Sequence, residues 1–364
     1  MPAPPADTPE SVGQPSGGDV LVAPTGKALL DAEREGFVVE GGLIPMAAIE
    51  AGAEQRKRTL GLGAWLAIAW LTLMVGMAIL APVLPVGDPS ETITLDRPCP
   101  TAVRLGREIE QCDIAGRGPF ADEGTARGYP LGGDGNSRSM LARLVYGART
   151  SLVVAVGAVA LGFAIGGSLG MLAGYFGGKI DTVLTGFFNV LLSIPAIILA
   201  LALVAFLATQ SAAGGGGTGL PRELILIIAI GVVAIPLLGR ITRASALTWS
   251  QREFVLAARA QGAKNLRIMI REVLPNVLPA MFSIALLGIA VAIVAEGALS
   301  ILGVGVEPPT PSWGNMIALD RGFLLAGSPH VVIEPAILIF LSVLSLNYLG
   351  DVVRARFDVR EAGI

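Results

Sequence analysis

The chain has 364 residues, of which 53% are hydrophobic and only 15% are charged, and its mean hydropathy is +0.68. Because an ordinary soluble domain does not expose so much apolar side chain, this composition excludes a soluble fold and predicts an integral membrane protein. The net charge of -3 says little about partners, because the first 55 residues carry nine acids against two bases, or -7, which leaves +4 for the rest.

The N-terminal segment, residues 1–58, is rich in proline, glycine and acids and almost lacks aromatic residues. Such a segment cannot bury enough apolar area to offset its chain entropy, so we expect a disordered acidic tail in the cytosol. The first apolar run follows Arg56-Lys57-Arg58 and is too long for the core of a secretory signal. We therefore predict that this run is a retained membrane span.

Six apolar runs follow the tail. Five of them approach or exceed the roughly 20 residues that cross a bilayer. These five are Leu60–Leu84, Leu152–Phe176, Val183–Ala208, Val277–Leu302 and Val331–Leu349. The sixth, Leu224–Gly239, covers only about 24 Å at 1.5 Å per residue, against a hydrocarbon core of roughly 30 Å, so we expect its helix to continue past Arg240.

Backbone polar groups must be paired internally in lipid, so all six runs are expected to be helices. The predicted fold is an all-α polytopic membrane protein with six transmembrane helices. We expect a first transmembrane helix at 59–84, an extracytoplasmic loop at 85–140, a core with five transmembrane helices at 141–354 and a cytosolic tail at 355–364. Basic residues beside the first and last runs place both termini in the cytoplasm.

The loop at 85–140 contains six arginines, which alone would argue for the cytoplasmic side. Its length weakens that objection, because the positive-inside rule applies to short loops, so we keep it outside. Both cysteines of the chain, Cys99 and Cys112, fall in this loop. In an oxidising compartment, a bridge between them would stabilise the loop by about 3 kcal/mol. The alternative is two unpaired thiols, which a cytosolic loop would favour.

The chemistry of common catalytic sites is missing from the sequence. A single histidine, His330, and two cysteines cannot assemble a nucleophilic triad or a typical zinc site, so we expect neither catalytic nor metal-binding residues. The nearest approach to a phosphate-binding loop, around Lys179, has Ala173 and Ile180 where a glycine and a hydroxyl residue are required. If the chain transports a solute against a gradient, the energy must come from elsewhere.

Three residues in or beside the runs are candidates for pathway or interface roles. Glu296 is the one embedded acid; it could line a substrate path, or equally reach the outer water or bond a neighbouring helix. Pro195 lies inside the third run and removes one backbone hydrogen bond, which predicts either a kink at a gate or a static packing kink. Trp313 is expected to anchor the chain at the outer interface.

The segment from Glu253 to Pro275, which we call the polar island, is basic and amphipathic and lies between two apolar runs. Its bases place it in the cytoplasm, where the small residues Ala257, Ala258 and Gly262 offer a close docking surface for a partner. Gly262 is a poor interior helix residue and is expected to end a helix.

Two further features of the polar island leave alternatives open. Arg259 and Arg267 could pair with acids on a partner, or face solvent and lipid headgroups. Pro275 is expected to mark the bend at which the chain re-enters the membrane.

The pattern Ala257-Ala258, Gly262 and Leu274-Pro275 resembles the EAA loop of ABC-importer permeases, which forms the coupling helix that docks into the ATPase subunit. Four more segments are similar to signatures of the dipeptide and oligopeptide permease class (DppC/OppC class). They are YPLGGDGNSRSMLARLVYGARTSL at 129–152, LLSIPAIILALALVAFL at 191–207, AEGALSILGVGVEPPTPSWGNMIA at 295–318 and the C-terminal LSLNYLGDVVRARFD. The resemblance covers nearly everything from Leu60 onward.

This resemblance implies the transmembrane domain of a type I ABC importer, a permease that moves di- and oligopeptides across the bacterial cytoplasmic membrane. It implies a homologous second permease as heterodimer partner, two ATPase subunits that carry the ATP and magnesium, an external substrate-binding protein, and no nucleic acid. The chain itself would bind no cofactor and catalyse no reaction. The ATPase-coupling residues would be Glu253, Leu256, Ala257, Ala258, Arg259, Gly262, Arg267 and Pro275.

One departure concerns the residue that names the loop. Leu256 stands where the motif has glutamate, and Glu253, one helical turn earlier, is only a possible substitute. Docking should therefore rest on small-residue packing and on the surrounding arginines.

Other functions stay open at this point. Within the importer class, the cargo could be nickel chelates, glutathione or another small solute, because the binding protein sets most of the specificity. A stand-alone secondary transporter or channel is the alternative from a different class. The lack of an ion site in the second, third and fourth runs disfavours it.

Overall fold

The computed structural model describes residues 38–39, 42–43, 61–94, 101–104, 107–110, 114–116, 129–212, 219–324 and 328–357. The chain divides into two units, Met1–Gly61 and Leu62–Ile364. In the first unit, β1 (Val38–Val39) pairs with β2 (Gly42–Leu43) in an antiparallel hairpin. Cys99, Cys112 and most of the predicted acidic tail lie outside the described residues.

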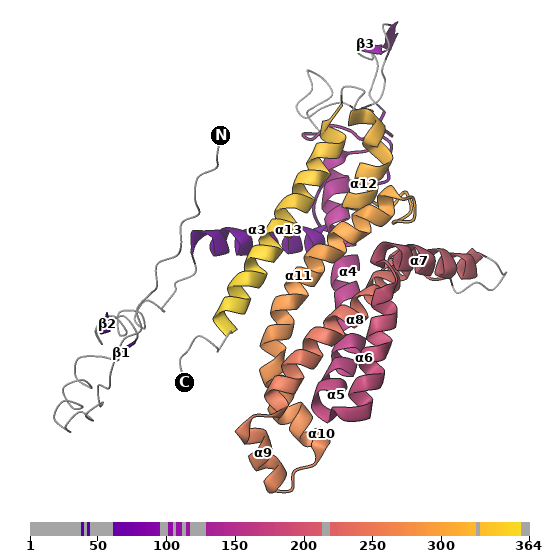
Figure 1. Cartoon of the computed structure of the whole chain (residues 1–364). Coiled ribbons are helices and arrows are strands. Elements are labelled where there is room, and N and C mark those ends of the chain that lie inside the picture. Colours follow the sequence, from indigo (N-terminus) through magenta and orange to yellow (C-terminus); the bar gives the residue numbers. More distant parts are fainter. Residues whose placement is uncertain are drawn as a thin grey trace, which may run out of the picture. The chain divides into compact units, whose positions relative to one another are not determined.

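The second unit is built almost entirely of helices (Figure 1). One short hairpin, β3 (Thr101–Arg104) with β4 (Arg107–Glu110), lies in the loop after α3. The helices up to the polar island are α3 (Leu62–Leu80), α4 (Met140–Gly162), η1 (Phe163–Gly167), α5 (Ser168–Phe176), α6 (Gly178–Ser193), α7 (Ala196–Ala212) and α8 (Arg222–Ser250). The rest are α9 (Glu253–Ala260), α10 (Asn265–Ile268), η2 (Met269–Val273), α11 (Leu274–Ile301), α12 (Trp313–Asp320), η3 (Arg321–Leu324) and α13 (His330–Phe357).

Within the described chain, five helices are long and apolar enough to cross a membrane, and the bent pair α6–α7 is the sixth candidate. The all-α polytopic fold is thereby confirmed. α8 runs through Arg240 and ends at Ser250, as its short apolar run predicted. Two helical runs, Met140–Phe176 and Asn265–Ile301, each continue for 37 residues, or about 55 Å at 1.5 Å per residue. They are longer than the roughly 30 Å hydrocarbon core, so they extend well beyond it.

The third apolar run differs from the prediction of a kinked span. α6 ends at Ser193, α7 begins at Ala196, and the two helices meet at 88°. Ile194 is extended, with φ -89° and ψ 127°, which is the conformation that a following proline imposes. The Pro195 carbonyl accepts hydrogen bonds from the amides of Ile198 and Leu199, so Pro195 starts a new helix rather than bending an old one.

η1 and α5 pack against α8 through a row of glycines, Gly166, Gly170 and Gly174. A Cβ atom on any of the three would overlap a backbone carbonyl oxygen of α8, those of Ile235, Gly239 and Arg243 respectively. Both sets are spaced by four residues, so each lies along one helical face. The two helices therefore touch backbone to backbone, as small residues permit between membrane helices.

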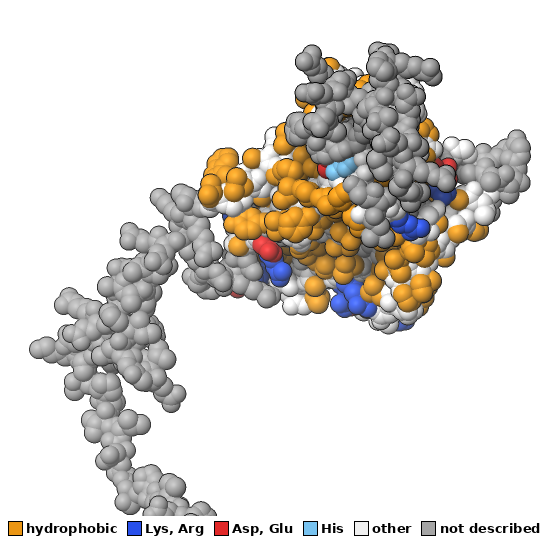
Figure 2. All heavy atoms as spheres, turned by 90° about the horizontal axis from the view of Figure 1, so that it is seen from above, with side chains coloured by type: hydrophobic (Ala, Val, Ile, Leu, Met, Phe, Trp, Pro, Cys, Tyr) orange, Lys and Arg blue, Asp and Glu red, His pale blue; other side chains and the backbone are white. Residues whose placement is uncertain are grey.

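The largest buried apolar cluster lies where α4, α8 and α11 meet and includes Val154, Leu226 and Ile293. Outside it, large apolar side chains stay exposed along the helices, for example Val183 at 69% and Val291 at 68%. Figure 2, which views the molecule from above, shows hydrophobic side chains over much of the described surface and charged side chains in small groups. Such a surface suits a lipid environment or further membrane subunits.

Candidate functional site

The polar island folds into two short helices and a tight turn at one end of the helical unit (Figure 1). Gly262 has φ +79°, in the left-handed region that favours glycine, and follows the end of α9. The Gly262 amide donates to the Arg259 carbonyl and the Ala263 amide to the Ala258 carbonyl, the paired bonds of a Schellman cap. The prediction that Gly262 ends a helix is confirmed.

The predicted re-entry bend at Pro275 is wrong. The helix that enters the bundle already begins at Asn265 and continues without a break through η2 into α11, so the chain turns at 261–264 instead. Pro275 is the second residue of α11 and follows the π-helix η2 directly, so it lies inside the continuous helical run and not at a bend.

A small apolar core braces the island against the rest of the bundle. Val255 of α9, together with Ile268 and Val273, is fully buried beside Tyr175 at the end of α5. The Tyr175 hydroxyl donates to the Asn265 side-chain oxygen at 3.2 Å. The Arg259 guanidinium lies 5.3 Å from the centre of the Tyr175 ring, within the range of a cation–π contact. Tyr175 thus holds both helices of the island.

The island also exposes four large apolar side chains. Phe254 is 38% exposed, Leu256 54%, Leu266 62% and Ile270 50%. We call these four residues, with the exposed Ala257, the apolar face of the island. It borders the exposed charges of Glu253, Arg259 and Arg267, whereas Ala258 is half-buried against the small core.

Near the same end, α6 is tied to α8. The Arg243 side chain makes two hydrogen bonds to Asp181, one of them at 2.6 Å from Nη2 to Oδ2, and Thr185 also donates to this carboxylate. Arg240, one turn earlier on α8, donates to Asn189. Both arginines are partly exposed, so these contacts are worth less than buried ones would be. They fix α6 laterally while α7 turns away.

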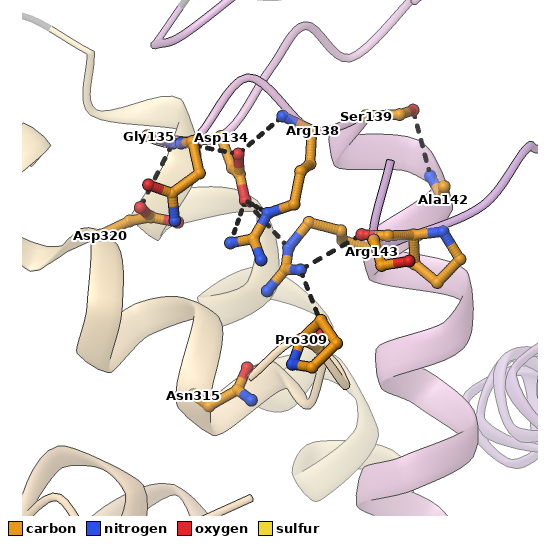
Figure 3. A network of polar contacts seen from close by, with 12 residues as sticks. Asp134, Gly135, Arg138, Ser139, Ala142, Arg143, Pro309, Asn315 and Asp320 are labelled. Atoms are coloured by element: carbon orange, nitrogen blue, oxygen red, sulfur yellow. Dashed lines mark hydrogen bonds and ion pairs between the residues drawn. The ribbon is translucent and has the colours of Figure 1, made fainter. Parts of the chain in front are cut away.

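At the opposite end, near α12, four charged residues form the ionic network: Asp134, Arg138, Arg143 and Asp320 (Figure 3). Asp134 Oδ2 lies 2.7 Å from Arg138 Nη2 and 3.1 Å from Arg143 Nε. Arg143 and Asp134 are both fully buried. The second Asp134 oxygen accepts from the backbone amides of Asn136 and Arg138, so this carboxylate organises its own turn.

The ionic network joins segments that are far apart in the sequence. Arg143 Nη1 donates to the carbonyl of Pro89 at 3.3 Å and to that of Pro309 at 3.4 Å. Asp320 accepts from the Gly135 amide at 3.3 Å. Burial, and then the negative charge of Asp134, raise the pKa of the Asp320 carboxyl from 3.8 to about 6. The carboxyl is therefore held in a site that favours its neutral form.

Glu296 is fully buried among hydroxyl groups. It accepts hydrogen bonds from Ser300 at 2.9 Å, Ser312 at 2.7 Å and Ser151 at 3.4 Å. Because Ser151 belongs to α4 and Ser312 caps α12, this acid links three helices. Of the alternatives left open above, the structure contains the bond to a neighbouring helix; a role in the pathway stays a prediction.

Trp313 is not the interface anchor that the sequence suggested. It is fully buried, and its indole nitrogen donates to the Leu144 carbonyl at 3.1 Å. The N-cap Ser312 and Asn315 form a reciprocal capping box that starts α12 at Trp313 and points this side chain into the bundle. The serine before an apolar run was the available signal.

Sequence reasoning missed the residues that fix both ends. They are Arg143 and Tyr175, although an arginine so close to an apolar run indicates a buried partner.

The structure brings five of the predicted coupling residues to the surface of one module: Glu253, Leu256, Ala257, Arg259 and Arg267. Ala258 is turned toward the core of that module, and Pro195 and Glu296 lie on other elements. Across the described ranges, no group of three or more His, Cys, Asp or Glu side chains is arranged to hold a metal ion.

The chain is similar in sequence to known transport proteins. Residues 166–362 match the family described as binding-protein-dependent transport system inner membrane component. The chain is 38% identical over 236 residues to the dipeptide transport system permease protein DppC of Alkalihalophilus pseudofirmus, covering 65% of this chain and 73% of that protein. It is 34% identical over 296 residues to the di/tripeptide transport system permease protein DppC of Pseudomonas aeruginosa, covering 81% and 88%.

The chain is also similar to a glutathione permease and to a solved transporter structure. The chain is 33% identical over 237 residues to the glutathione transport system permease protein GsiD of Pectobacterium atrosepticum, covering 65% of this chain and 74% of that protein. Among solved structures, a chain of the MetNI methionine ABC transporter in an inward-facing conformation superposes with a TM-score of 0.48 at 24% identity, covering 59% of this chain and 97% of that chain.

Proposed function

This chain belongs to the family of binding-protein-dependent transport system inner membrane components, and from that membership we propose that it is the permease subunit of an ABC importer for di- and oligopeptides. The two dipeptide-class relatives named above support peptides as the cargo. Glutathione, itself a peptide, is the neighbouring case, because a glutathione permease is also similar.

The observation that carries the proposal is the apolar face of the island. Four large apolar side chains are exposed on a module whose other exposed residues are mostly charged or polar and that stands at the end of two long helices. We propose a protein partner as the occupant that buries this face, because the hydrocarbon core does not accommodate the charges around it. We propose a soluble ATPase subunit as this partner, since it is the cytosolic partner that an ABC-importer permease requires.

Several further parts belong to the proposed assembly. We infer two ATPase subunits below the island that carry the ATP and magnesium, a homologous second permease beside the bundle, and an external substrate-binding protein. The proposed orientation places the island and both termini in the cytoplasm and the α12 end outside, in a bacterial cytoplasmic membrane. The basic residues of the island support this orientation.

The braced island provides a route for motion in this proposal. When ATP draws the ATPase subunits together, the docked apolar face moves with them. Tyr175 and Val255 tie the island to α5, and the glycine row ties α5 to α8, so these elements are displaced as a body. Such a rigid displacement is the kind of change that switches a two-state assembly between its openings.

The glutamate of the loop motif is replaced here by an exposed apolar side chain. Leu256, which takes its place, is 54% exposed on the apolar face, so it offers burial where the motif offers a charge. We therefore propose that docking on this permease depends on apolar contact, with Arg259 and Arg267 as flanking charges and Glu253 as an auxiliary one. Burying an exposed leucine contributes about 1.5–3 kcal/mol at most.

The test uses two changes on the apolar face. Ala257→Trp adds bulk to the docking surface, and Leu256→Gln replaces one of its exposed aliphatic side chains with a polar one while keeping the position neutral. Each is expected to reduce ATPase co-purification and ATP-driven peptide uptake in vesicles, by about tenfold for a loss of 1.4 kcal/mol. The matched control is Arg354→Trp, an exposed position on α13 outside the island, which should leave both measurements unchanged.

Two results would contradict the proposal. Normal uptake and normal co-purification in both variants would remove the apolar face from the coupling mechanism. Peptide flux through vesicles that contain this chain alone, without ATP, would instead favour a stand-alone transporter or channel.

A further inference from the structure

A pocket opens at the α12 end of the bundle, on the side opposite the island. It has a volume of about 440 Å³, which lies within the range of roughly 300–1,000 Å³ typical of small-ligand sites. Tyr146, Arg149 and Thr150 of α4 form one wall and Glu223 of α8 another. The remaining walls are the loops around Pro89 and Pro309.

Buried polar groups hold the two loops of this pocket in place. Arg143, on the buried side of α4, donates to the carbonyls of both Pro89 and Pro309. Asn315 donates to the carbonyl of Thr310, the next lining residue, at 2.7 Å. The ionic network and the capping box of α12 therefore set the shape of the pocket before any ligand enters, which is how a preorganised site lowers the cost of binding.

The charged side chains that line the pocket, unlike the buried groups behind it, are accessible and unpaired within the described residues. Arg149 is exposed, Glu223 is half-buried, and each lines the cavity. The neighbouring charges pair with each other outside it, since Arg222 lies 3.5 Å from Glu307. In the described part of the chain, Arg149 and Glu223 have no ion-pair partner, so the pocket presents one positive and one negative group from different helices.

From this arrangement we infer that the pocket is a binding site for a short peptide with both termini free. Arg149 receives the C-terminal carboxylate, for which its guanidinium offers two parallel donors. Glu223 receives the N-terminal ammonium group. Tyr146, Val153 and the two proline-bearing loops supply apolar surface for the peptide side chains. This inference rests on the proposed function and adds to it an initial binding site on the permease for the incoming peptide.

The experiment uses the whole importer in vesicles and a radiolabelled dipeptide below saturation. Arg149→Gln and Glu223→Gln are each expected to lower the uptake rate by about tenfold, the effect of losing one charge-assisted hydrogen bond. Arg149→Gln should not affect a C-terminally amidated dipeptide, nor Glu223→Gln an N-acetylated one. Arg222→Gln and Glu307→Gln are the matched controls, because they remove the same charges at the same end outside the pocket lining, and should stay within about twofold.

A second measurement identifies what occupies the pocket. A photoreactive residue in place of Val153, which is 52% exposed at the pocket wall, is expected to form an adduct with the labelled dipeptide. Unlabelled dipeptide should compete, and the doubly blocked analogue should not. Uptake by the wild-type importer combined with unchanged rates in Arg149→Gln and Glu223→Gln would overturn this site alone, as would an adduct with the binding protein or the second permease. Absence of peptide uptake by the wild type would instead contradict the proposed function.

Discussion

At the scale of single residues, Arg143 shows how a buried charge organises a loop region. Its guanidinium meets Asp134 and two proline carbonyls, and no part of the side chain is exposed. Removing one partner of such a buried pair costs about 3–5 kcal/mol, because the other charge is left without compensation. Arg138 still faces Asp134 when Arg143 is changed, so the lower end of that range applies.

We therefore predict that Arg143→Met destabilises the protein by about 3 kcal/mol, measured as thermal unfolding of the purified chain in detergent. Arg143→Lys should not restore stability, because an ammonium group cannot reach the carboxylate and both carbonyls in the same planar geometry. Arg321→Met, at an exposed position beside the network, is the control and should change stability by about 0.5 kcal/mol or less. An Arg143→Met protein as stable as the wild type would show that the ionic network does not hold the loops.

Asp320 gives the second residue-scale prediction. Its folded-state pKa of about 6 lies above the ordinary 3.8, so folding disfavours the ionised carboxyl. The unfolded chain then releases its proton at lower pH than the folded one, and the wild type loses stability as pH rises from about 4 to about 6. Asp320→Asn keeps an oxygen acceptor for the Gly135 amide but cannot ionise.

The difference in unfolding temperature between Asp320→Asn and the wild type measures this effect. The variant should be the more stable protein above about pH 6, and its advantage should disappear below about pH 4. A constant difference across that range would mean that the Asp320 carboxyl titrates alike in the folded and unfolded chains.

Some residues of the site followed from the sequence because a local rule decided them. Gly262 ends α9 since few other residues adopt its positive φ, and its position in the loop pattern was already informative. Tyr175 and Arg143 did not follow, because Tyr175 bonds to Asn265, 90 residues away, and Arg143 bonds to the carbonyls of Pro89 and Pro309, 54 and 166 residues away. Pairing over such distances depends on how the helices pack, which no short pattern contains.

At the scale of elements, the right-angled joint between α6 and α7 is the feature to test. Pro195 removes an amide donor, and its ring clashes with the preceding turn, so a straight helix through this point costs about 3 kcal/mol more than with alanine. Pro195→Ala is expected to add a population in which α6 and α7 are continuous. In that state residues 183 and 206 would be about 35 Å apart at 1.5 Å per residue, and they are closer in the bent form.

Spin labels at Val183 and Phe206, both exposed, report this distance in the vesicle-embedded importer. Ile194→Ala, which keeps the proline, is the control and should retain the single shorter distance. If Pro195→Ala also shows only that distance, packing rather than the proline sets the joint.

Helix existence was predictable from the sequence, but helix ends were not. α4 begins at Met140, twelve residues before its apolar run, because Ser139 caps it and accepts from the Ala142 amide at 3.4 Å. Hydropathy detects only the part of a helix that suits lipid, so it missed the extensions on both 37-residue helices. The glycine row was visible in the sequence as a four-residue spacing, but its partner helix was not.

At the scale of the whole molecule, the two candidate sites lie at opposite ends of one element. Arg149 in the pocket and Tyr175 under the island both belong to the continuous run Met140–Phe176. They are separated by about 39 Å at 1.5 Å per residue. A single helix of this length, held to α8 by the glycine row, allows little relative movement between its ends.

Such a connection makes the influence of the two ends mutual. If engagement of an ATPase on the island changes the affinity of the pocket for peptide by some factor, thermodynamic linkage requires that peptide change the affinity for the ATPase by the same factor. The run Met140–Phe176 would therefore transmit the presence of peptide in the pocket to the island as strongly as it transmits the motion of the island to the pocket. An importer built on it would sense whether it is loaded without a separate receptor for that signal.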